Sequence, residues 1–490
     1  MKNTIIFLSI ILLQMNSFSQ IDFNFNKVDK SKYRIAGEVV NLPDTSVLLA
    51  YYFGGKQYAT DTAYSKNGIF VFEGDKELDG GMYMIVLPNQ LFFDLVISEQ
   101  FFSFSTILDP NDQNSLINNM TFSQSKENTP FYEYLKFIMI KQNQAKVLKQ
   151  KGNNELLANL DIEVKNYREN FEKKYSDLFF TKVLRATQDP ILPDPPKNLK
   201  DEKEIQLFQF ESYRDNYWIN VDFSDKRILR TPIFFNKMDT YLNKLTVQHP
   251  DSISKAADIL VRYSRLNKDI FQYVVSYITS TYERSKIMGM DAVFVHMVEN
   301  YYMTGEVDWV DDDQLVKIEE RAEKIAPNLI GRPAPPFVNQ LGMPFMKDPE
   351  GKIKRLYDLE SKYTLLIFYA PDCGHCKKEL PRVKKVLDTL TSTNILDKKN
   401  DVSVFAVQTE FDREKWLEFI EDQGTGDWIN VCDMQTDPDG NPAASSNWRD
   451  QYDIYSTPVI YILDKDKNIL AKRIAYNQIS QIIKREEGIE

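Results

Sequence analysis

Residues 363–376 have the sequence YTLLIFYAPDCGHC, an apolar run that leads into two cysteines separated by two residues. A short run this apolar is typical of a strand that is buried on both faces of a parallel sheet. Further apolar runs and helical patterns alternate after it, at 376–395 (helix), 402–407 (strand), 412–422 (helix) and 459–463 (strand). This alternation predicts an α/β sheet with crossover connections in residues 329–490.

The two cysteines, Cys373 and Cys376, are expected at the start of the helix that follows the first strand. Two intervening residues allow a disulfide to close across the first helical turn. Cys373 is then exposed, with unpaired backbone N–H groups facing its sulfur, and these groups together with the helix dipole stabilise a thiolate. We therefore predict that Cys373 is the attacking thiol and that the more buried Cys376 is the resolving thiol.

The residues around the cysteines are expected to tune their redox potential. A protonated imidazole at His375 favours the neighbouring thiolate, which stabilises the dithiol and raises the potential. The pair Gly374 and His375 fits a potential near about −180 mV better than one near about −270 mV. Asp372 opposes this effect because it places negative charge beside the nucleophile. The direction of electron flow stays open.

At these residues the chain resembles the thioredoxin superfamily and, within it, the exported TlpA-like thiol-disulfide oxidoreductases, over about residues 330–485. Three features carry the resemblance: the strand that ends in the motif, Pro381 eight residues after Cys373, and the sequence STPV at 456–459. The resemblance implies a thioredoxin-like fold with the active-site helix kinked at its proline. It also implies a cis-proline loop, in which Thr457 and Pro458 dock the backbone of a partner as an extra strand.

One position departs from the family pattern. Thioredoxins carry a buried Asp six residues before the first cysteine, where it accepts the proton of the resolving thiol, and this chain has Ile367 there. TlpA-like proteins can place a carboxylate three residues after the second cysteine, which is Glu379 here. Glu379 and Cys376 share a helix face because residues i and i+3 are neighbours. Glu379 is thus a candidate acid/base residue, with a surface salt bridge as the alternative role.

Other uses of these cysteines fit the sequence less well. A structural zinc site needs four ligands, and only two cysteines and one histidine lie together here. Haem attachment needs His directly after Cys376, where the chain has Lys377. A peroxiredoxin would carry Thr at the position of Ala370. The third cysteine, Cys432, is interpreted as a small buried residue rather than a redox thiol. We expect no metal and no cofactor.

Two further regions precede the α/β region. Residues 20–125 contain short runs rich in β-branched and aromatic residues, which predict an antiparallel β domain. Asn67 and Gly68 lie between two such runs and predict a hairpin turn. Residues 126–328 are predicted to be mostly helical, with a helix capped by Thr129, a stop at Gly152 and a proline-rich break at 190–196. Later helices are expected at 232–247, 252–265, 267–288 and 312–325.

The N-terminus predicts export. Lys2 precedes the apolar stretch 5–13, and Ser17 and Ser19 offer small residues for signal peptidase, so residues 1–19 are expected to be a cleavable signal peptide. The stretch is shorter than the roughly 20 residues of a transmembrane helix. The absence of cysteine near the cleavage point argues against a lipid anchor. We predict a periplasmic protein without a transmembrane span, with an uncleaved membrane anchor as the alternative.

Composition limits the function further. Of the 490 residues, 43% are hydrophobic and 13% aromatic, which excludes a largely disordered chain. The net charge of −11 argues against nucleic-acid binding, and three cysteines cannot form a disulfide framework. We therefore expect an enzyme that exchanges disulfides with exported proteins and has a membrane redox partner as electron donor or acceptor. The alternative is an adaptor whose N-terminal domains dominate and whose redox module is accessory.

Overall fold

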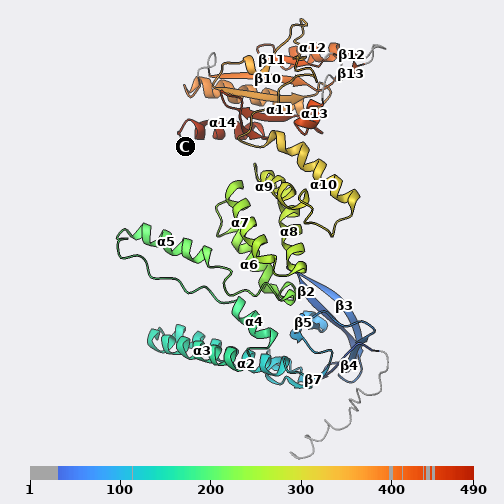
Figure 1. Ribbon diagram of the computed structural model, residues 1–490, viewed down its shortest axis with the longest axis vertical. Helices are drawn as coiled ribbons and strands as arrows, with labels where there is room; N and C mark the ends of the chain where they lie inside the picture. The colour runs from blue at the N-terminus through green and yellow to red at the C-terminus, as the bar shows by residue number, and fades with distance from the viewer. Residues whose placement is uncertain are drawn as a thin grey trace, which may run out of the picture. The chain divides into compact units, whose positions relative to one another are not determined.

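The computed structural model describes residues 31–112, 114–396, 401–410, 412–433, 435–436, 442–443 and 447–489 (Figure 1). The chain divides into two compact units, Met1–Tyr241 and Leu242–Glu490, and each is described by itself. The expected signal peptide at 1–19 lies outside the described residues, and the domain boundaries at 125 and 328 stay predictions. Within the described part of the chain, every helix is too short or too polar to cross a bilayer.

The first unit begins with two four-stranded sheets, which confirm the predicted β region. One sheet has the order β4-β1-β7-β8, with strands at Ile69–Gly74, Tyr33–Val40, Phe101–Ile107 and Thr121–Ser123. The other has the order β3-β2-β5-β6, with strands at Lys56–Ser65, Thr45–Phe53, Gly81–Val86 and Phe92–Ile97. The two sheets meet through aromatic side chains, with the rings of Phe93 and Phe104 5.5 Å apart. The pairing is antiparallel except between β1 and β7, which run parallel.

The turn at Asn67 and Gly68 has the positive φ angles of a hairpin turn, 52° and 82°. The strands on either side nevertheless belong to different sheets, since β4 pairs with β1 and not with β3. The rings of Phe70 and Phe72 in β4 are only 2% and 1% exposed. The predicted hairpin turn is confirmed, since Lys66 and Ile69 exchange both backbone hydrogen bonds around it, at 2.9 and 3.0 Å, and burial of the aromatic face accounts for the different sheet that β4 then joins.

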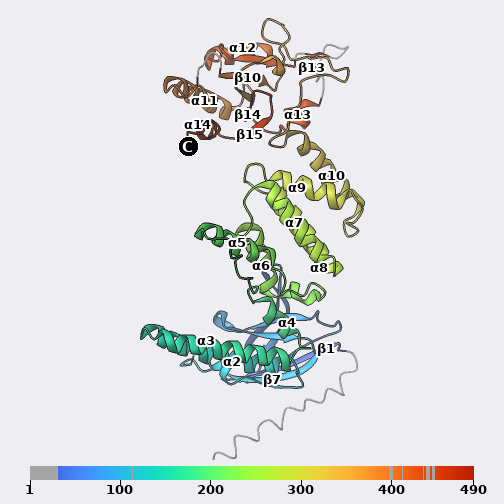
Figure 2. The same cartoon turned by 60° about the vertical axis from the view of Figure 1, so that its left-hand side comes forward.

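Helices complete the first unit, and α2 and α3 lie side by side (Figure 2). The helices are α1 (Ser115–Asn118), α2 (Asn128–Gln150), α3 (Asn154–Lys174), α4 (Phe179–Ala186), α5 (Glu202–Asp215) and, at the end of the unit, α6 (Pro232–Asn243). α2 begins at Asn128, so the prediction of Thr129 as its cap was wrong. The Asn128 side chain instead bonds the backbone of Val96 in β6, accepting from its N–H at 2.8 Å and donating to its carbonyl at 2.7 Å.

The second unit starts with four helices, of which the first and the last agree with the predictions at 252–265 and 312–325. They are α7 (Pro250–Ser264), α8 (Lys268–Glu283), α9 (Asp291–Met297) and α10 (Asp312–Ile325). The helix predicted over 267–288 ends at Glu283, and a loop with Gly289 at a φ of 85° leads into α9. His296 of α9 lies 2.7 Å from Asp258 of α7, a contact that joins the two helices.

The α/β part of this unit is a five-stranded sheet of order β11-β10-β9-β14-β15. The strands β11, β10 and β9 run parallel to one another, and β14 runs antiparallel to both of its neighbours, β9 and β15. Its strands are β9 (Tyr363–Tyr369), β10 (Val402–Gln408), β11 (Ile429–Cys432), β14 (Val459–Leu463) and β15 (Ile469–Lys472). A separate pair is formed by β12 (Gln435–Thr436) and β13 (Pro442–Ala443). The helices are α11 (Gly374–Ser392), α12 (Arg413–Asp422), α13 (Trp448–Gln451) and α14 (Tyr476–Glu486).

Strand β9 is buried on both faces, as its apolar sequence predicts. All seven of its residues are buried. Ile367 and its alternate neighbours pack with α11, α12 and α14 in one hydrophobic cluster. Phe368 packs on the other face with Phe337 and Trp448. The central strand therefore fixes the point at which the chain leaves the sheet and enters α11.

Candidate redox site

The cysteine motif lies where β9 ends and α11 begins. Cys373 is the residue before the helix, with extended backbone angles (φ −77°, ψ 113°), and the helix starts at Gly374. Lys377 N–H donates to the Cys373 carbonyl at 3.1 Å, which closes the first turn. Cys376 therefore lies within that turn, and its side chain faces the hydrophobic cluster. This is the arrangement that the spacing of the two cysteines indicates.

The Cys373 thiol is half-buried and faces a loop far away in the sequence. Its Sγ donates to the backbone carbonyl of Thr457 at 3.2 Å. Burial disfavours the thiolate, but hydrogen bonds from the Thr457 side chain and from N–H groups of the first helical turn outweigh it and hold the pKa of the Cys373 thiol below its ordinary value. A larger fraction of this thiol is thus ionised near neutral pH, which is what a nucleophile requires.

Cys376 differs from its neighbour because it is fully buried. Burial, reinforced by the charge of the nearby Cys373 thiolate, raises the pKa of the Cys376 thiol to about 12. Burial destabilises a charged sulfur because apolar surroundings solvate it poorly. Cys376 therefore stays protonated until a base removes its proton, as a resolving thiol would.

The candidate base, Glu379, lies on the same helix and is partly exposed. Among the described residues, the Glu379 carboxylate forms an ion pair with Arg382 at 3.5 Å and forms no hydrogen bond with Cys376. Its side chain is 24% exposed. Ile367, which replaces the buried Asp of thioredoxins, is completely buried. The acid/base role of Glu379 stays a prediction.

Gly374 and His375 are exposed at the start of α11, beside the attacking thiol. The neighbouring Asp372 has a partner that sequence reasoning missed, because Lys415 of α12 contacts it at 2.6 Å. This contact holds the pKa of Asp372 below its usual range. The lysine also offsets the negative charge beside Cys373, which weakens the opposing effect expected of Asp372.

The loop opposite the motif contains Thr457 and Pro458. The peptide bond between them is cis, as the family resemblance implies. The Thr457 carbonyl that accepts from Cys373 directly precedes this bond. The fold thus brings together two sites that lie 84 positions apart in the sequence.

Cys432, the third cysteine, lies in a different environment. It is 3% exposed, and its Sγ donates to the side chain of Gln408 at 2.9 Å and to the Glu410 carbonyl at 3.2 Å. Burial raises the pKa of its thiol to about 12. These observations confirm the interpretation of Cys432 as a small buried residue.

A buried polar network behind the motif is a feature that the sequence did not reveal. Trp416 donates from Nε1 to the Tyr369 hydroxyl at 2.8 Å, and that hydroxyl donates to Asn430 Oδ1 at 3.1 Å. Tyr369 belongs to the same cluster as Cys376. The sequence offered one signal of this network, an aromatic residue (Tyr369) at the end of an apolar strand. The partners of that residue come from α12 and β11.

Family models match three regions of the chain. Residues 330–472 match the model of the AhpC/TSA family, while 33–131 and 164–328 match two domains of unknown function, DUF4369 and DUF5106. No curated protein matches the chain.

Several solved bacterial structures are similar. A domain of a "possible thiol-disulfide isomerase" from Cytophaga hutchinsonii is 36% identical, over 33% of this chain and 96% of its own, with a TM-score of 0.26. The thioredoxin domain of a thiol-disulfide oxidoreductase from Bacteroides vulgatus is 23% identical, over 33% and 98%, with a TM-score of 0.25. A thioredoxin-like protein from Bacteroides caccae is 19% identical, over 60% and 97%, with a TM-score of 0.42.

The match to the AhpC/TSA family covers the segment that holds Cys373, Cys376 and the cis-proline loop. The chain carries an AhpC/TSA family domain at its C-terminus, and its structural neighbours are thioredoxin-like thiol-disulfide oxidoreductases.

Proposed function

We propose that this protein exchanges disulfides with exported partner proteins through Cys373 and Cys376. The observation that carries the proposal is the Cys373 thiol, which has a lowered pKa and lies 3.2 Å from the Thr457 carbonyl at a cis-proline loop. A nucleophilic sulfur beside exposed backbone is suited to a disulfide held in an extended polypeptide. In this proposal Thr457 and Pro458 dock the partner's backbone as an extra strand.

The reaction has two displacement steps. The Cys373 thiolate attacks one sulfur of the partner disulfide, and a mixed disulfide forms while the other partner sulfur leaves as a thiolate and takes up a proton. Cys376 then gives its proton to Glu379 and attacks the Cys373 sulfur. The partner leaves as a second thiol, and a Cys373–Cys376 disulfide remains. Two electrons have passed from the dithiol to the partner, and the reverse sequence oxidises a partner dithiol.

Export to the periplasm is part of the proposal. It is supported by the signal-peptide pattern at 1–19, and a thiol-disulfide exchange enzyme has substrates in an oxidising compartment. There, a membrane redox partner would supply or accept the electrons. Exposed Gly374 and His375 favour a potential suited to reduction or isomerisation, near about −180 mV.

The test is reduction of insulin disulfides by the full chain with dithiothreitol as electron donor. We expect the wild type to accelerate reduction and Cys373→Ser to show only the background rate, because it lacks the attacking sulfur. Cys376→Ser is the matched control: reduced beforehand and mixed with insulin without dithiothreitol, it should still attack and should accumulate a mixed disulfide, visible as a covalent adduct by mass spectrometry. No acceleration by the wild type, and no adduct with Cys376→Ser, would contradict the proposal.

The direction of electron flow has its own measurement. Equilibration of the Cys373–Cys376 pair with glutathione buffers gives its reduction potential. A value near about −270 mV would support a reductase, and one near about −120 mV an oxidant.

A further inference from the structure

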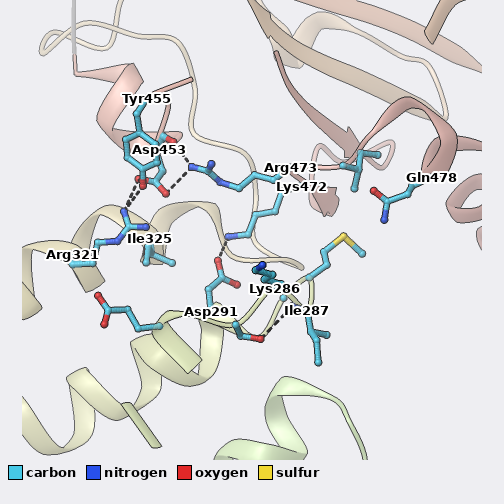
Figure 3. Close-up of a pocket in the computed structure, with 15 residues that line it drawn as sticks. Lys286, Ile287, Asp291, Arg321, Ile325, Asp453, Tyr455, Lys472, Arg473 and Gln478 are labelled. Carbon is cyan, nitrogen blue, oxygen red and sulfur yellow. Dashed lines mark hydrogen bonds and ion pairs between the residues drawn. The ribbon is translucent and has the colours of Figure 1, made fainter. Parts of the chain in front are cut away.

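The second unit contains a cavity of about 420 Å³ outside the cysteine motif (Figure 3). One wall is the loop between α8 and α9 together with side chains of α10. The other wall consists of residues around Asp453 and Tyr455, the end of β15 and the start of α14. The cavity therefore lies between the thioredoxin-like domain and the helices that precede it in the same unit.

This cavity adjoins the redox site. Tyr455, which lines it, is two residues before Thr457, the residue whose carbonyl accepts from Cys373. Two residues of extended chain span at most about 7 Å, so the cavity begins within that distance along the docking loop. Ile474 is a second lining residue, and it belongs to the cluster that contains Cys376 and against which Cys373 packs. The cavity is thus connected to the redox site through the chain at Tyr455 and through this hydrophobic cluster.

Two guanidinium groups cover one carboxylate in this wall. Figure 3 shows Arg321 and Arg473 approaching Asp453 from different sides, and each comes within 2.7 Å of one of its oxygens. The side chain of Asp453 is only 6% exposed, whereas those of Arg321 and Arg473 are 34% and 36% exposed. The negative charge therefore lies beneath the two positive ones, and the surface that faces solvent is positive.

The rest of the lining follows the same pattern. Lys472, only 5% exposed, pairs with Asp291 at 2.5 Å, so these two charges offset each other. Lys286 is exposed on the loop after α8, and Glu283 is the exposed acidic residue of the rim. Apolar surface is present as well, since Ile287 is 58% exposed. The lining as a whole holds four cations (Lys286, Arg321, Lys472 and Arg473) against three carboxylates (Glu283, Asp291 and Asp453), a balance of +1 on a chain whose net charge is −11.

We propose that this cavity binds an acidic segment of the partner polypeptide next to its reactive cysteine. The inference rests on the proposed function and specifies which substrates the site prefers. A partner strand held at Thr457 has its neighbouring residues within reach of Tyr455 and the cavity. Carboxylate side chains in that segment would face Lys286, Arg321 and Arg473. Opposite charges near a reaction site raise the encounter rate and fix the register of the bound strand.

The experiment uses two disulfide-bonded peptides that differ only in the residues flanking the cysteines, Glu in one and Lys in the other. The variant is Lys286→Glu, because removing Arg321 or Arg473 would disturb the buried Asp453. The control is Lys317→Glu, an equal charge change at an exposed position of α10 outside the cavity lining. Second-order rate constants for reduction are measured at low and high salt, and a small neutral disulfide serves as a third probe.

We expect the wild type and Lys317→Glu to reduce the Glu peptide about tenfold faster than the Lys peptide. Lys286→Glu should lower this ratio at least threefold and leave the rate with the neutral disulfide unchanged. High salt should reduce the ratio by screening the charges. A ratio that is the same in wild type and Lys286→Glu, with the neutral disulfide still reduced, overturns the cavity proposal alone. If no protein reduces any of the three probes, the proposed function fails and this inference with it.

Discussion

Cys373 and Cys432 are the same residue type in the same domain, yet the protein shifts their pKa values in opposite directions. Around Cys373, hydrogen-bond donors of the first turn of α11 and the Thr457 side chain surround the sulfur and favour the thiolate. Around Cys432, burial is the largest influence and the charge of the nearby Asp433 adds to it, so the thiolate is disfavoured. The comparison teaches that hydrogen-bond donors around the Cys373 sulfur outweigh the effect of burial, which prevails at Cys432.

The largest expected effect is on alkylation. With a pKa of about 12, roughly one Cys432 thiol in 10⁵ is ionised at pH 7, whereas a pKa below the ordinary value leaves at least about 1% of Cys373 ionised. Iodoacetamide should therefore modify Cys373 at least about 10³-fold faster than Cys432, as measured by mass spectrometry of digested protein. The Cys373 rate should also reach its plateau at a lower pH than that of the same cysteine in the unfolded chain. Equal rates at the two sites would remove the basis of the comparison.

Cys376 and Cys432 offer a second contrast, since burial raises the pKa of both thiols to about 12. Only Cys376 is proposed to ionise during the reaction, so it needs a base that Cys432 lacks. If Glu379 is that base, Glu379→Gln should slow the resolving step about 10²-fold, a typical contribution of general base catalysis. Stopped-flow reaction with an aromatic disulfide reagent separates the two steps, because each releases one coloured thiolate.

The control for this experiment is Arg382→Gln, which breaks the same ion pair from the other side. If the pair is merely a surface salt bridge, both variants lose at most about 1 kcal/mol of stability and leave both phases unchanged. A slower second phase in Glu379→Gln alone would assign the base.

The smallest effect is expected at Cys432. Cys432→Ala removes a buried sulfur and its two hydrogen bonds, so we expect a loss of about 1–2 kcal/mol in the free energy of unfolding, measured by urea denaturation. The insulin reduction rate should stay at the wild-type value because the residue takes no part in the exchange. A fall in this rate while the variant remains fully folded would show that Cys432 is a third redox thiol.

The sequence predicted those parts of the site that depend on local order. An apolar strand followed by a helix fixes where Cys373 and Cys376 lie, and the family resemblance supplied the cis bond before Pro458. It could not predict the contact between Asp372 and Lys415, which are 43 positions apart, because nothing local distinguishes that lysine from other exposed ones. The same limit applies to β4. The turn before it suggested that it pairs with β3, whereas burial of its aromatic face accounts for its pairing with β1.

The pairing of Lys472 has a consequence for how this protein can be divided. Lys472 lies in β15, but its partners Asp291 and Asn328 both precede residue 330, where the AhpC/TSA match begins. A fragment cut at that point would lose Asp291 and Asn328, so the Lys472 ammonium would keep neither its counter-charge nor this hydrogen-bond acceptor. The boundary drawn by sequence similarity therefore passes through an ion pair. An expression fragment that keeps the pair would also include α7 and α8, which pack against α9, and would therefore start before Pro250.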